Sequence, residues 1–579
     1  MKFNIKKSFY DNKSLPKLLK RIVLVAFIIL LVVLFNYQAI NGSYYLKRAE
    51  NNYVRAIPLY SLRGSIFDRN GTVLARDQAS FNLAVFPYQI KNEKDILFKK
   101  LSEEAGISEK IIHKNYEENI SGYFSPTNII FDVSKETALI LKEKYPKSLL
   151  VNSAPQRKYL KPLELAHILG YVKKASSLQS QFKKYGYKPL ERIGIYGIEQ
   201  YYDSYLQGQD GGDLVEVDVS GNVVGFLGRK KPVSGNDIFL TIDSKIQKFA
   251  KNSFAKKRGS LILLESGSGK IIALYSSPSF DPNLFIAGDD LTSLYKNKFS
   301  PLFNRAIQGA FPIGSLIKPL LATAGLEEDK IEPETTFNCK GRLNLGNNIF
   351  RCSGSHGIQN LEQALAHSCN VYFYNLGLRL GPENISHWLK AFGLDSKTFI
   401  DIPYEKKGFV PTPKWKKEKF GQSWYSGDTL NLSIGQGYLH TTPLAITIAI
   451  NAIANNGYLV EPTLLKKIGK EETSYLFKKS INISQKNINI VKNGLRKTVS
   501  KNSGTARMLK NLSLGICGKT GTAQTSGKSH GWFVGFFPYK NPKYTVSVFL
   551  EKGGSSYQAL RVVYNFLSNL KQNNLIEVK

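Results

Sequence analysis

The chain has 579 residues, more than one ordinary hydrophobic core accommodates, so two or more folded units are expected. Its composition, 42% hydrophobic and 12% aromatic, excludes an intrinsically disordered chain. The formal net charge of +34 comes largely from lysines spread along the sequence; it favours anionic partners, although a well-solvated lysine-rich surface would also explain it. No nucleic-acid-binding motif accompanies this charge, so nucleic acid is not an expected partner.

An uninterrupted apolar run covers residues 22–35 and continues more weakly to Ile40. Its length of about 18 to 20 residues is enough to cross a bilayer as a helix. Lysine and arginine outnumber the single acid Asp11 before the run, which predicts that residues 1–21 are cytoplasmic and that the remainder is exported. A cleaved signal peptide is the alternative. Because no small-x-small cleavage site follows closely, an uncleaved single-pass anchor over residues 22–40 is favoured.

The exported part is predicted to divide into a pedestal at residues 41–233 and a second domain at residues 234–579. In the pedestal, residues 64–75 predict two strands joined by an Asn-Gly turn, and residues 91–147 show helical spacing. Residues 218–223 predict a further turn between strands. The pedestal is therefore expected to be an extended mixed α/β module, and no cluster of catalytic residues is expected within it.

The second domain is predicted to have strands at both ends. These strands are expected at residues 238–242, 261–264, 270–275, 531–537 and 544–550. Asp243 is expected to cap a helix after the first strand, and another helix is expected from about Ser556. Strands at both ends with helices between them predict one antiparallel sheet with a helical cluster, so the fold class is α+β.

Three short motifs in the second domain carry the chemistry. Ser315-Leu-Ile-Lys318 is followed after about 50 residues by Ser368-Cys-Asn370, and after about 150 more by Lys519-Thr-Gly-Thr522. Each motif is weak alone, since Ser-x-x-Lys also begins at Ser14 and Ser293. In this order and spacing they match the signature of serine acyl transfer in penicillin-interacting enzymes.

The first two motifs predict an activated nucleophile. Ser315 is expected to attack the substrate, and Lys318, one helical turn further on, to take its proton. The lysine must then be partly neutral, which requires burial or a neighbouring cation such as Lys519. Ser368 would relay a proton, and Asn370 would hydrogen-bond a substrate amide.

The third motif is predicted to lie on a strand beside the substrate. Lys519 and the hydroxyl groups of Thr520 and Thr522 would hold a substrate carboxylate. Gly521 would let the substrate backbone approach closely. The backbone N–H groups of Ser315 and Thr522 would form an oxyanion hole.

Longer motifs make the chain resemble a class B penicillin-binding protein over about residues 58–560. The resemblance rests on residues 63–71 and 197–208 in the pedestal and on residues 304–315 and 530–535 in the second domain. Residues 424–437 resemble the elongation type of this family more than the septal type. The septal type stays an alternative, as does a penicillin-binding sensor, which would need a cytoplasmic effector larger than residues 1–21.

The resemblance implies a serine D,D-transpeptidase that cross-links peptidoglycan stem peptides and that β-lactams acylate at Ser315. A D,D-carboxypeptidase side activity is implied as well. The implied partners are the lipid-linked precursor, a glycosyltransferase of the shape-and-division type and an elongation scaffold protein, all at the plasma (inner) membrane. A partner is expected to polymerise the glycan because no glycosyltransferase segment is recognised before residue 233.

Three of the four cysteines lie close together in the sequence, at Cys339, Cys352 and Cys369, with His356 among them. A Cys3His set suits tetrahedral Zn²⁺. The family resemblance implies a zinc site here, matched at His356 and Cys369, with Cys339 and Cys352 in place of two acidic residues. A Cys339–Cys352 disulfide and free buried thiols are the alternatives. Cys517 is expected to be a core strand residue.

Overall fold

The computed structural model describes residues 15–120, 122, 126–174, 192–218, 223–287, 291–472 and 477–577. It divides into two compact units, one of Met1–Ser61 with Gln209–Val233 and the other of Leu62–Gly208 with Ser234–Lys579. Most of the predicted cytoplasmic segment and the predicted turn at residues 219–222 lie outside the described residues. The first unit ends at the predicted boundary near residue 233, but most of the predicted pedestal belongs to the second unit, so the predicted domain limits stay a prediction.

The first unit contains the apolar helix. α1 (Leu15–Phe35) continues through the π-helical turn η1 (Asn36–Ile40) to α2 (Gly42–Tyr53). Within the described residues, Pro16–Ile40 is the one helical stretch long and apolar enough to cross a membrane, and it is exposed along its length. These features are consistent with a single-pass membrane anchor. The same unit holds the antiparallel sheet β1 (Val54–Leu59), β8 (Gly211–Val217) and β9 (Val223–Lys230).

The second unit begins with a mixed α/β region. Its strands are β2 (Ile66–Phe67), β3 (Val73–Val85), β4 (Thr127–Val133), β5 (Leu150–Tyr159), β6 (Val172–Lys174) and β7 (Arg192–Gly194). Its helices are α3 (Lys94–Ala105), α4 (Glu109–Asn119), α5 (Lys135–Lys144), α6 (Pro162–Leu169), α7 (Gly197–Tyr201) and α8 (Asp203–Leu206). The predicted helical spacing over residues 91–147 is therefore right for three helices and wrong for β4, whose buried Ile129 and Ile130 pack under α4.

A sheet joins this region to the C-terminal part of the unit. β10 (Ile238–Leu240) pairs in parallel with β2, and the strand order is β19-β18-β10-β2-β3-β4, with β5 also paired to β3. The additional strands are β18 (Leu465–Ile468) and β19 (Glu471–Glu472). Beside the sheet, buried Glu199 accepts from Arg63 Nε at 2.6 Å and from Arg157 Nε at 2.7 Å. These buried charges compensate one another, which gives the pedestal motifs at residues 63–71 and 197–208 a structural role.

The C-terminal part is built on a five-stranded antiparallel sheet. Its order is β12-β11-β23-β22-β21, from β11 (Gly259–Glu265), β12 (Ile271–Ser277), β21 (Cys517–Ala523), β22 (His530–Phe537) and β23 (Tyr544–Leu550). Along β22, Trp532 and Val534 belong to one core, while Phe533 and Phe537 belong to the other. This alternation places a hydrophobic layer on each face of the sheet.

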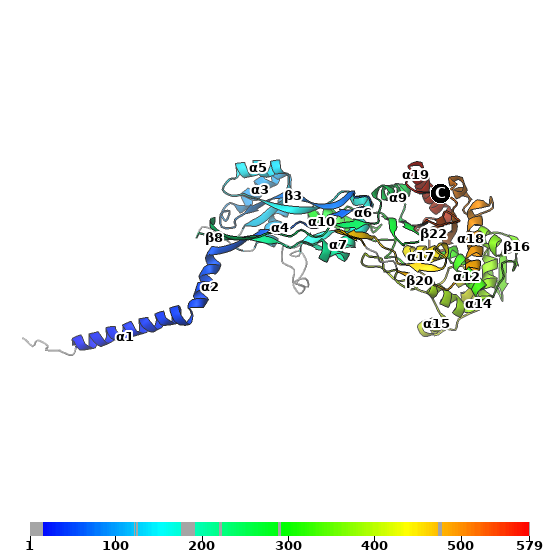
Figure 1. Cartoon of the computed structure of the whole chain (residues 1–579), viewed down its shortest axis with the longest axis horizontal. Coiled ribbons are helices and arrows are strands. Elements are labelled where there is room, and N and C mark those ends of the chain that lie inside the picture. The colour runs from blue at the N-terminus through cyan, green and yellow to red at the C-terminus, as the bar shows by residue number, and fades with distance from the viewer. Residues whose placement is uncertain are drawn as a thin grey trace, which may run out of the picture. The chain divides into compact units, whose positions relative to one another are not determined.

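Helices cover both faces of the sheet. α9 (Ser244–Phe254) and α19 (Ser556–Gln572) pack on one face, and α17 (Pro443–Ala454) packs on the other (Figure 1). α17 is mainly apolar and wholly buried, and its N-terminus is capped by Thr442, which accepts from the Ala445 N–H. The α+β class, the Asp243 cap, the 261–275 hairpin and the C-terminal strand pair with its helix are thus confirmed.

A helical cluster and several short hairpins complete the unit. Its helices are η4 (Gly314–Ile317), α12 (Lys318–Glu327), α13 (Leu361–His367), α14 (Asn370–Ala391), α15 (Pro413–Phe420), α16 (Ser426–Ser433), α18 (Gln485–Ser500) and η5 (Arg507–Leu512), with the short α10 (Leu284–Ala287) and α11 (Thr292–Tyr295). The short strands are β13 (Phe337–Cys339), β14 (Arg342–Leu345), β15 (Asn348–Arg351), β16 (Gly357–Gln359), β17 (Tyr458–Val460) and β20 (Lys478–Ser480).

Candidate active site

Ser315 lies in a tight turn at the start of a buried helix. The 3₁₀ turn η4 contains Ser315 and runs directly into α12, so Lys318 follows one turn later, as expected from the spacing. Ser315 is partly exposed, whereas Lys318 is completely buried. The sequence therefore presents a hydroxyl group at the surface of the site and an ammonium group beneath it.

The second motif lies at the corner between α13 and α14. Lys318 Nζ donates to the Ser368 carbonyl oxygen at 2.7 Å, to Ser368 Oγ at 3.2 Å and to Asn370 Oδ1 at 2.7 Å. Ser368 caps α13 in the left-handed conformation, with φ 58°. A non-glycine residue rarely adopts this conformation, so the corner holds Ser368 in a strained but defined position.

The third motif brings a second lysine to the same hydroxyl group. Lys519 on β21 is completely buried, and its Nζ donates to Ser368 Oγ at 2.8 Å and to the Thr520 carbonyl oxygen at 3.1 Å. Lys318, Ser368, Asn370 and Lys519 thus form one connected hydrogen-bond network. The three hydrogen bonds of the Lys318 ammonium group all end on the second motif, so none of them reaches Ser315 in this state.

Burial perturbs both lysines. It lowers the pKa of Lys318 to about 8, against an opposing effect of the nearby Cys352 and Cys369. Burial also lowers the pKa of Lys519 well below its usual value, and the charge of Lys318 lowers it further. The expected low pKa of Lys318 is therefore present, but burial, not the charge of Lys519, is its cause.

Asn370 and Gly521 both make close contacts within the protein. The Asn370 amide makes two hydrogen bonds within the protein, since Oδ1 accepts from Lys318 and one N–H of Nδ2 donates to the Arg351 carbonyl oxygen at 3.1 Å. A Cβ on Gly521 would lie 2.7 Å from the Ile313 carbonyl oxygen. This glycine therefore lets β21 pack against the Ser315 turn, and the substrate backbone is not needed to explain it.

The two threonines of the third motif have different surroundings. Thr520 is buried and its hydroxyl group is 2.9 Å from that of Thr505. Thr522 is exposed, and its Oγ1 accepts from the Ser556 N–H at 3.2 Å. Since that bond uses only acceptor capacity, the Thr522 O–H stays free to donate to a ligand.

Glycine contacts hold the Ser315 turn in place. Gly314 has φ 55° and its N–H donates to the Gly435 carbonyl oxygen at 3.0 Å. A Cβ on Gly435, which has φ 70°, would lie 2.1 Å from the Gly314 carbonyl oxygen. Trp532 adds a hydrogen bond from Nε1 to the Pro312 carbonyl oxygen at 3.1 Å. These contacts give the 424–437 and 530–535 motifs a physical role at the nucleophile.

Gly435, Arg351 and Thr505 also contribute to the site, although no sequence pattern predicts them individually. Gly435 could have been recognised only as a member of the 424–437 motif. Nothing in the sequence distinguishes Arg351, whose backbone carbonyl makes the contact, or Thr505, which lies between a helix and a 3₁₀ segment.

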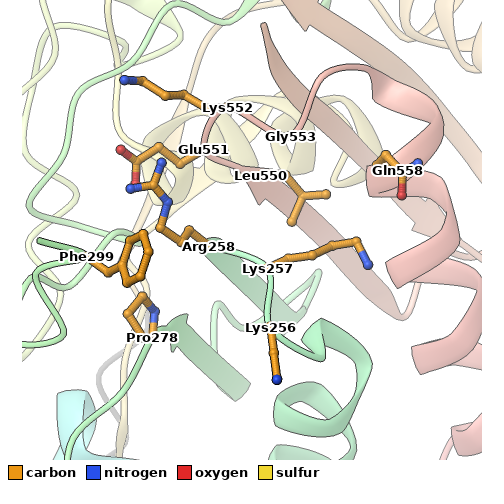
Figure 2. Close-up of a pocket in the computed structure, with 10 residues that line it drawn as sticks. All are labelled: Lys256, Lys257, Arg258, Pro278, Phe299, Leu550, Glu551, Lys552, Gly553 and Gln558. Carbon is orange, nitrogen blue, oxygen red and sulfur yellow. The ribbon is translucent and has the colours of Figure 1, made fainter. Parts of the chain in front are cut away.

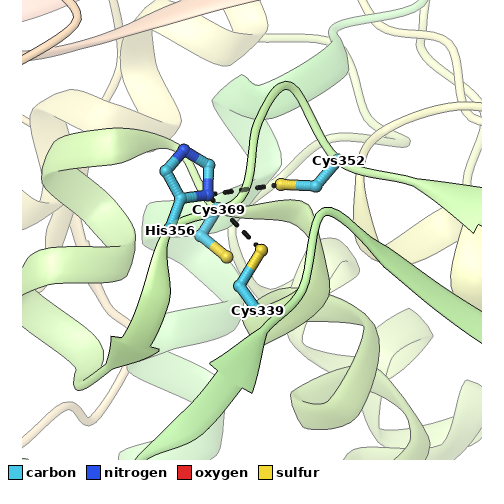
Figure 3. A group of neighbouring side chains, drawn as sticks. All are labelled: Cys339, Cys352, His356 and Cys369. Atoms are coloured by element: carbon cyan, nitrogen blue, oxygen red, sulfur yellow. Dashed lines mark hydrogen bonds between the residues drawn. The ribbon is translucent and has the colours of Figure 1, made fainter.

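The predicted metal-ligating residues come together immediately behind the second motif. Figure 3 shows Cys339, Cys352, His356 and Cys369 converging, and their ligand atoms all lie within 4.8 Å of one another. His356 Nδ1 is 3.5 Å from the sulfur of Cys339 and 3.5 Å from that of Cys352. None of the four cysteines, all of which the structure describes, is joined in a disulfide, and Cys517 is buried on β21 as expected.

The donor set fits a tetrahedral thiolate-rich ion. Zn–S distances of about 2.3 Å place ligand sulfurs about 4 Å apart, which the existing separations nearly satisfy. The Asn370 backbone N–H donates to Cys352 Sγ at 3.1 Å, and such a bond stabilises a thiolate ligand. Burial excludes competing water from Cys339 and Cys369.

The chain matches known protein families over most of its length. The family described as Penicillin binding protein transpeptidase domain matches residues 259–570, and the Penicillin-binding Protein dimerisation domain matches residues 58–240. The chain is 32% identical to the peptidoglycan D,D-transpeptidase MrdA of Haemophilus influenzae, over 95% of this chain and 92% of that protein.

Two solved structures are similar throughout. The complex of PBP2 with MreC from Helicobacter pylori has a TM-score of 0.81 and 27% identity, covering 91% of this chain and 100% of that one. A structure described as a peptidoglycan synthase complex that coordinates polymerization and crosslinking has a TM-score of 0.72 and 28% identity, covering 96% and 98%.

The chain therefore belongs to the penicillin-binding protein transpeptidase family. Within that family it is a class B protein of the PBP2/MrdA type, an elongation-type peptidoglycan D,D-transpeptidase. The expected family and the elongation type are confirmed, and the septal alternative is set aside.

Replacing Gly435 by alanine is expected to displace the nucleophile. The new Cβ would meet the Gly314 backbone, and a displacement of about 1 Å can lower a reaction rate about 100-fold. We expect β-lactam acylation of Gly435→Ala to slow by about that factor in stopped-flow fluorescence.

Gly421→Ala is the matched control, because Gly421 has a similar φ of 66° but no atom near its missing Cβ. The two variants share the backbone strain and differ in the clash. Equal acylation rates in both would show that the Gly314–Gly435 contact does not position Ser315.

Proposed function

We propose that Ser315 is the acylated nucleophile and that Lys318 is its general base. The support is the buried network itself, in which Lys318, one turn after Ser315, and Lys519 both donate to Ser368 Oγ. In the first half-reaction, Ser315 Oγ attacks the carbonyl of the penultimate D-alanine and Lys318 takes the hydroxyl proton. The C–N bond to the terminal D-alanine then breaks, and the departing amine receives a proton through Ser368.

The second half-reaction reverses these roles. An amine of a neighbouring stem peptide attacks the ester carbonyl, its proton returns through Ser368 and Lys318, and Ser315 is released as the new peptide bond forms. Water in place of the amine would give a D,D-carboxypeptidase reaction. The backbone N–H groups of Ser315 and Thr522 would stabilise the oxyanion in both halves.

Substrate binding is proposed to complete the electrostatics of the site. The C-terminal carboxylate of a stem peptide or of a β-lactam would accept from Thr522 and bring a negative charge to Lys519. That charge would raise the low pKa of Lys519 and keep it protonated, so Lys318 would be the lysine that loses its proton and acts as the base. Thr520 and Gly521 would position the strand, and Asn370 would hold Lys318 in place.

A structural Zn²⁺ is proposed at Cys339, Cys352, His356 and Cys369. It would supply a rigid link between the 339–356 hairpins and the second motif, because Cys369 lies between Ser368 and Asn370. No chemical step requires it. Free thiols outside the cell would oxidise, so bound metal also explains why three cysteines persist at the site.

The location and partners are proposed from the anchor and from the relatives. Residues 1–21 would be cytoplasmic, residues 22–40 would cross the plasma membrane, and the pedestal and transpeptidase domains would lie outside it. The Helicobacter pylori relative binds MreC, and the synthase complex couples cross-linking to polymerization. We infer an equivalent scaffold protein and a shape-and-division type glycosyltransferase as partners, with lipid-linked precursor and stem peptides as substrates.

Exposure of the purified protein to a β-lactam is expected to add the mass of one drug molecule. Ser315→Ala should show no adduct, because it lacks the attacking oxygen. Intact-mass spectrometry measures both, and Ser513→Ala serves as a control outside the network. An adduct on Ser315→Ala, or none on a folded native protein, would refute the assignment of Ser315.

Acylation is expected to depend on pH through Lys318. The base acts in its neutral form, so below its pKa of about 8 the rate should rise about tenfold per pH unit and level off above it. Lys318→Arg should be inactive at every pH, since a guanidinium group stays charged. A rate that falls as the pH rises through 8 would contradict the base role.

One zinc ion per chain is expected by metal analysis of the native protein. Cys352→Ser should lose the ion and lower the thermal unfolding midpoint by several degrees, whereas Cys517→Ser should keep it. Thiol titration after denaturation distinguishes the alternatives, since a Cys339–Cys352 disulfide would leave two reactive thiols in place of four. A metal-free native protein would refute the zinc assignment.

A further inference from the structure

A pocket outside the candidate active site lies at the turn between β23 and α19. It has a volume of about 390 Å³, and Figure 2 shows the residues around it. Its lining is mainly basic and apolar: Lys256, Lys257, Arg258, Pro278, Phe299, Leu550, Glu551, Lys552, Gly553 and Gln558. The predicted chemistry of the transpeptidase does not use any of them.

The pocket carries uncompensated positive charge. Its single carboxylate, Glu551, is already paired with Arg305 at 2.7 Å. In the part of the chain that the structure describes, Lys256, Lys257 and Lys552 form no ion pair. Arg258 lies over the Phe299 ring at 5.4 Å, which fixes the guanidinium group at the wall of the pocket. Such a cavity attracts an anion of modest size.

One row of residues across the sheet connects this pocket to the third motif. Thr522 pairs with Gly531, Gly531 pairs with Leu550, and Leu550 pairs with Gly259, the residue that follows Arg258. Leu550 and Gly259 lie two and three strand spacings of about 4.8 Å from Thr522, so the far wall of the pocket lies about 14 Å from Thr522 along the sheet.

The turn that lines the pocket also contacts the active site. Lys552 N–H donates to His530 Nδ1 at 3.0 Å, and Gly554 N–H donates to the Ser529 carbonyl oxygen at 2.9 Å. Directly after the turn, Ser556 N–H donates to Thr522 Oγ1 at 3.2 Å. Residues 551–556 therefore contact the third motif and the neighbouring strand β22. Three residues of the same segment, Glu551, Lys552 and Gly553, line the pocket.

We propose that this pocket binds a carboxylate of the peptidoglycan substrate at a distance from the scissile bond. An extended peptide covers about 14 Å in about four residues, so a stem peptide held at Thr522 reaches the pocket with a carboxylate on its far part. A β-lactam is too short to reach both places. The site rests on the proposed function and adds to it a recognition element for the polymeric substrate.

The test compares two triple variants with the same change in charge. Lys256→Gln/Lys257→Gln/Lys552→Gln removes the unpaired charges of the pocket. Lys110→Gln/Lys135→Gln/Lys147→Gln removes three exposed lysines of the mixed α/β region. Calorimetry on the full chain in detergent at low salt measures binding of a soluble disaccharide–peptide that lacks the terminal D-alanine and cannot be turned over.

The pocket variant is expected to bind this probe about tenfold more weakly than the native chain, since each exposed charge pair contributes a few-fold to affinity. The control variant should bind it like the native chain. A probe whose internal carboxylates are amidated should bind equally to all three proteins. Equal affinity of the pocket variant and the control for the free-carboxylate probe would overturn the proposal.

Two further arms identify the source of the anion and separate this proposal from the catalytic one. If the pocket variant loses affinity only for inorganic pyrophosphate, the site serves the phosphate of the lipid-linked precursor and the carboxylate assignment is wrong. β-Lactam acylation of the native protein, measured by intact-mass spectrometry, tests the role of Ser315 independently. Its failure refutes the proposed catalytic roles, whereas acylation together with unchanged probe binding refutes the pocket alone.

Discussion

Two buried ammonium groups meet at one hydroxyl group, and the rest of the site is arranged around this constraint. Lys318 and Lys519 are fully buried, and both donate to Ser368 Oγ. Within the described residues neither lysine forms an ion pair, so burial is compensated by oxygen acceptors and, for Lys318, by the Phe373 ring, whose centroid lies 5.5 Å from Nζ. Holding two cations there is costly, and the lowered pKa values express that cost. The site is therefore ready to release a proton and to receive an anion.

This arrangement requires rigid contacts, because the three motifs come from a helix start, a helix corner and a strand. The core that contains Ile317, Val371 and Trp532 joins these elements. Where they touch most closely, glycine replaces any side chain, at Gly314 and Gly521. The cost of left-handed backbone and of lost chain entropy in these places is offset by the close packing of the Ser315 turn against β21.

Strong local patterns explain what could be predicted from the sequence. The alternation in β22 and the Asp243 cap are local signals, and the motif spacing identified the family because its chemistry tolerates few substitutions. The features that the sequence did not predict depend on tertiary contacts. β4 was hidden among helical spacing because its partners lie far away in sequence. The partners of Asn370 and the inward-facing role of Gly521 depend on which backbone lies opposite, and no local pattern encodes that.

The cysteine cluster and the base belong to one continuous set of contacts. Cys352 Sγ accepts from the Asn370 backbone N–H, and the carbonyl oxygen of the neighbouring Arg351 accepts from the Asn370 side chain. Asn370 Oδ1 in turn accepts from Lys318. Arg351 and Cys352, at the end of the β14–β15 hairpin, therefore fix both the backbone and the side-chain amide of Asn370, the residue that hydrogen-bonds Lys318. An amide orientated in this way offers Lys318 an acceptor and no donor, which keeps the lysine in place without supplying a charge that would restore its ordinary basicity.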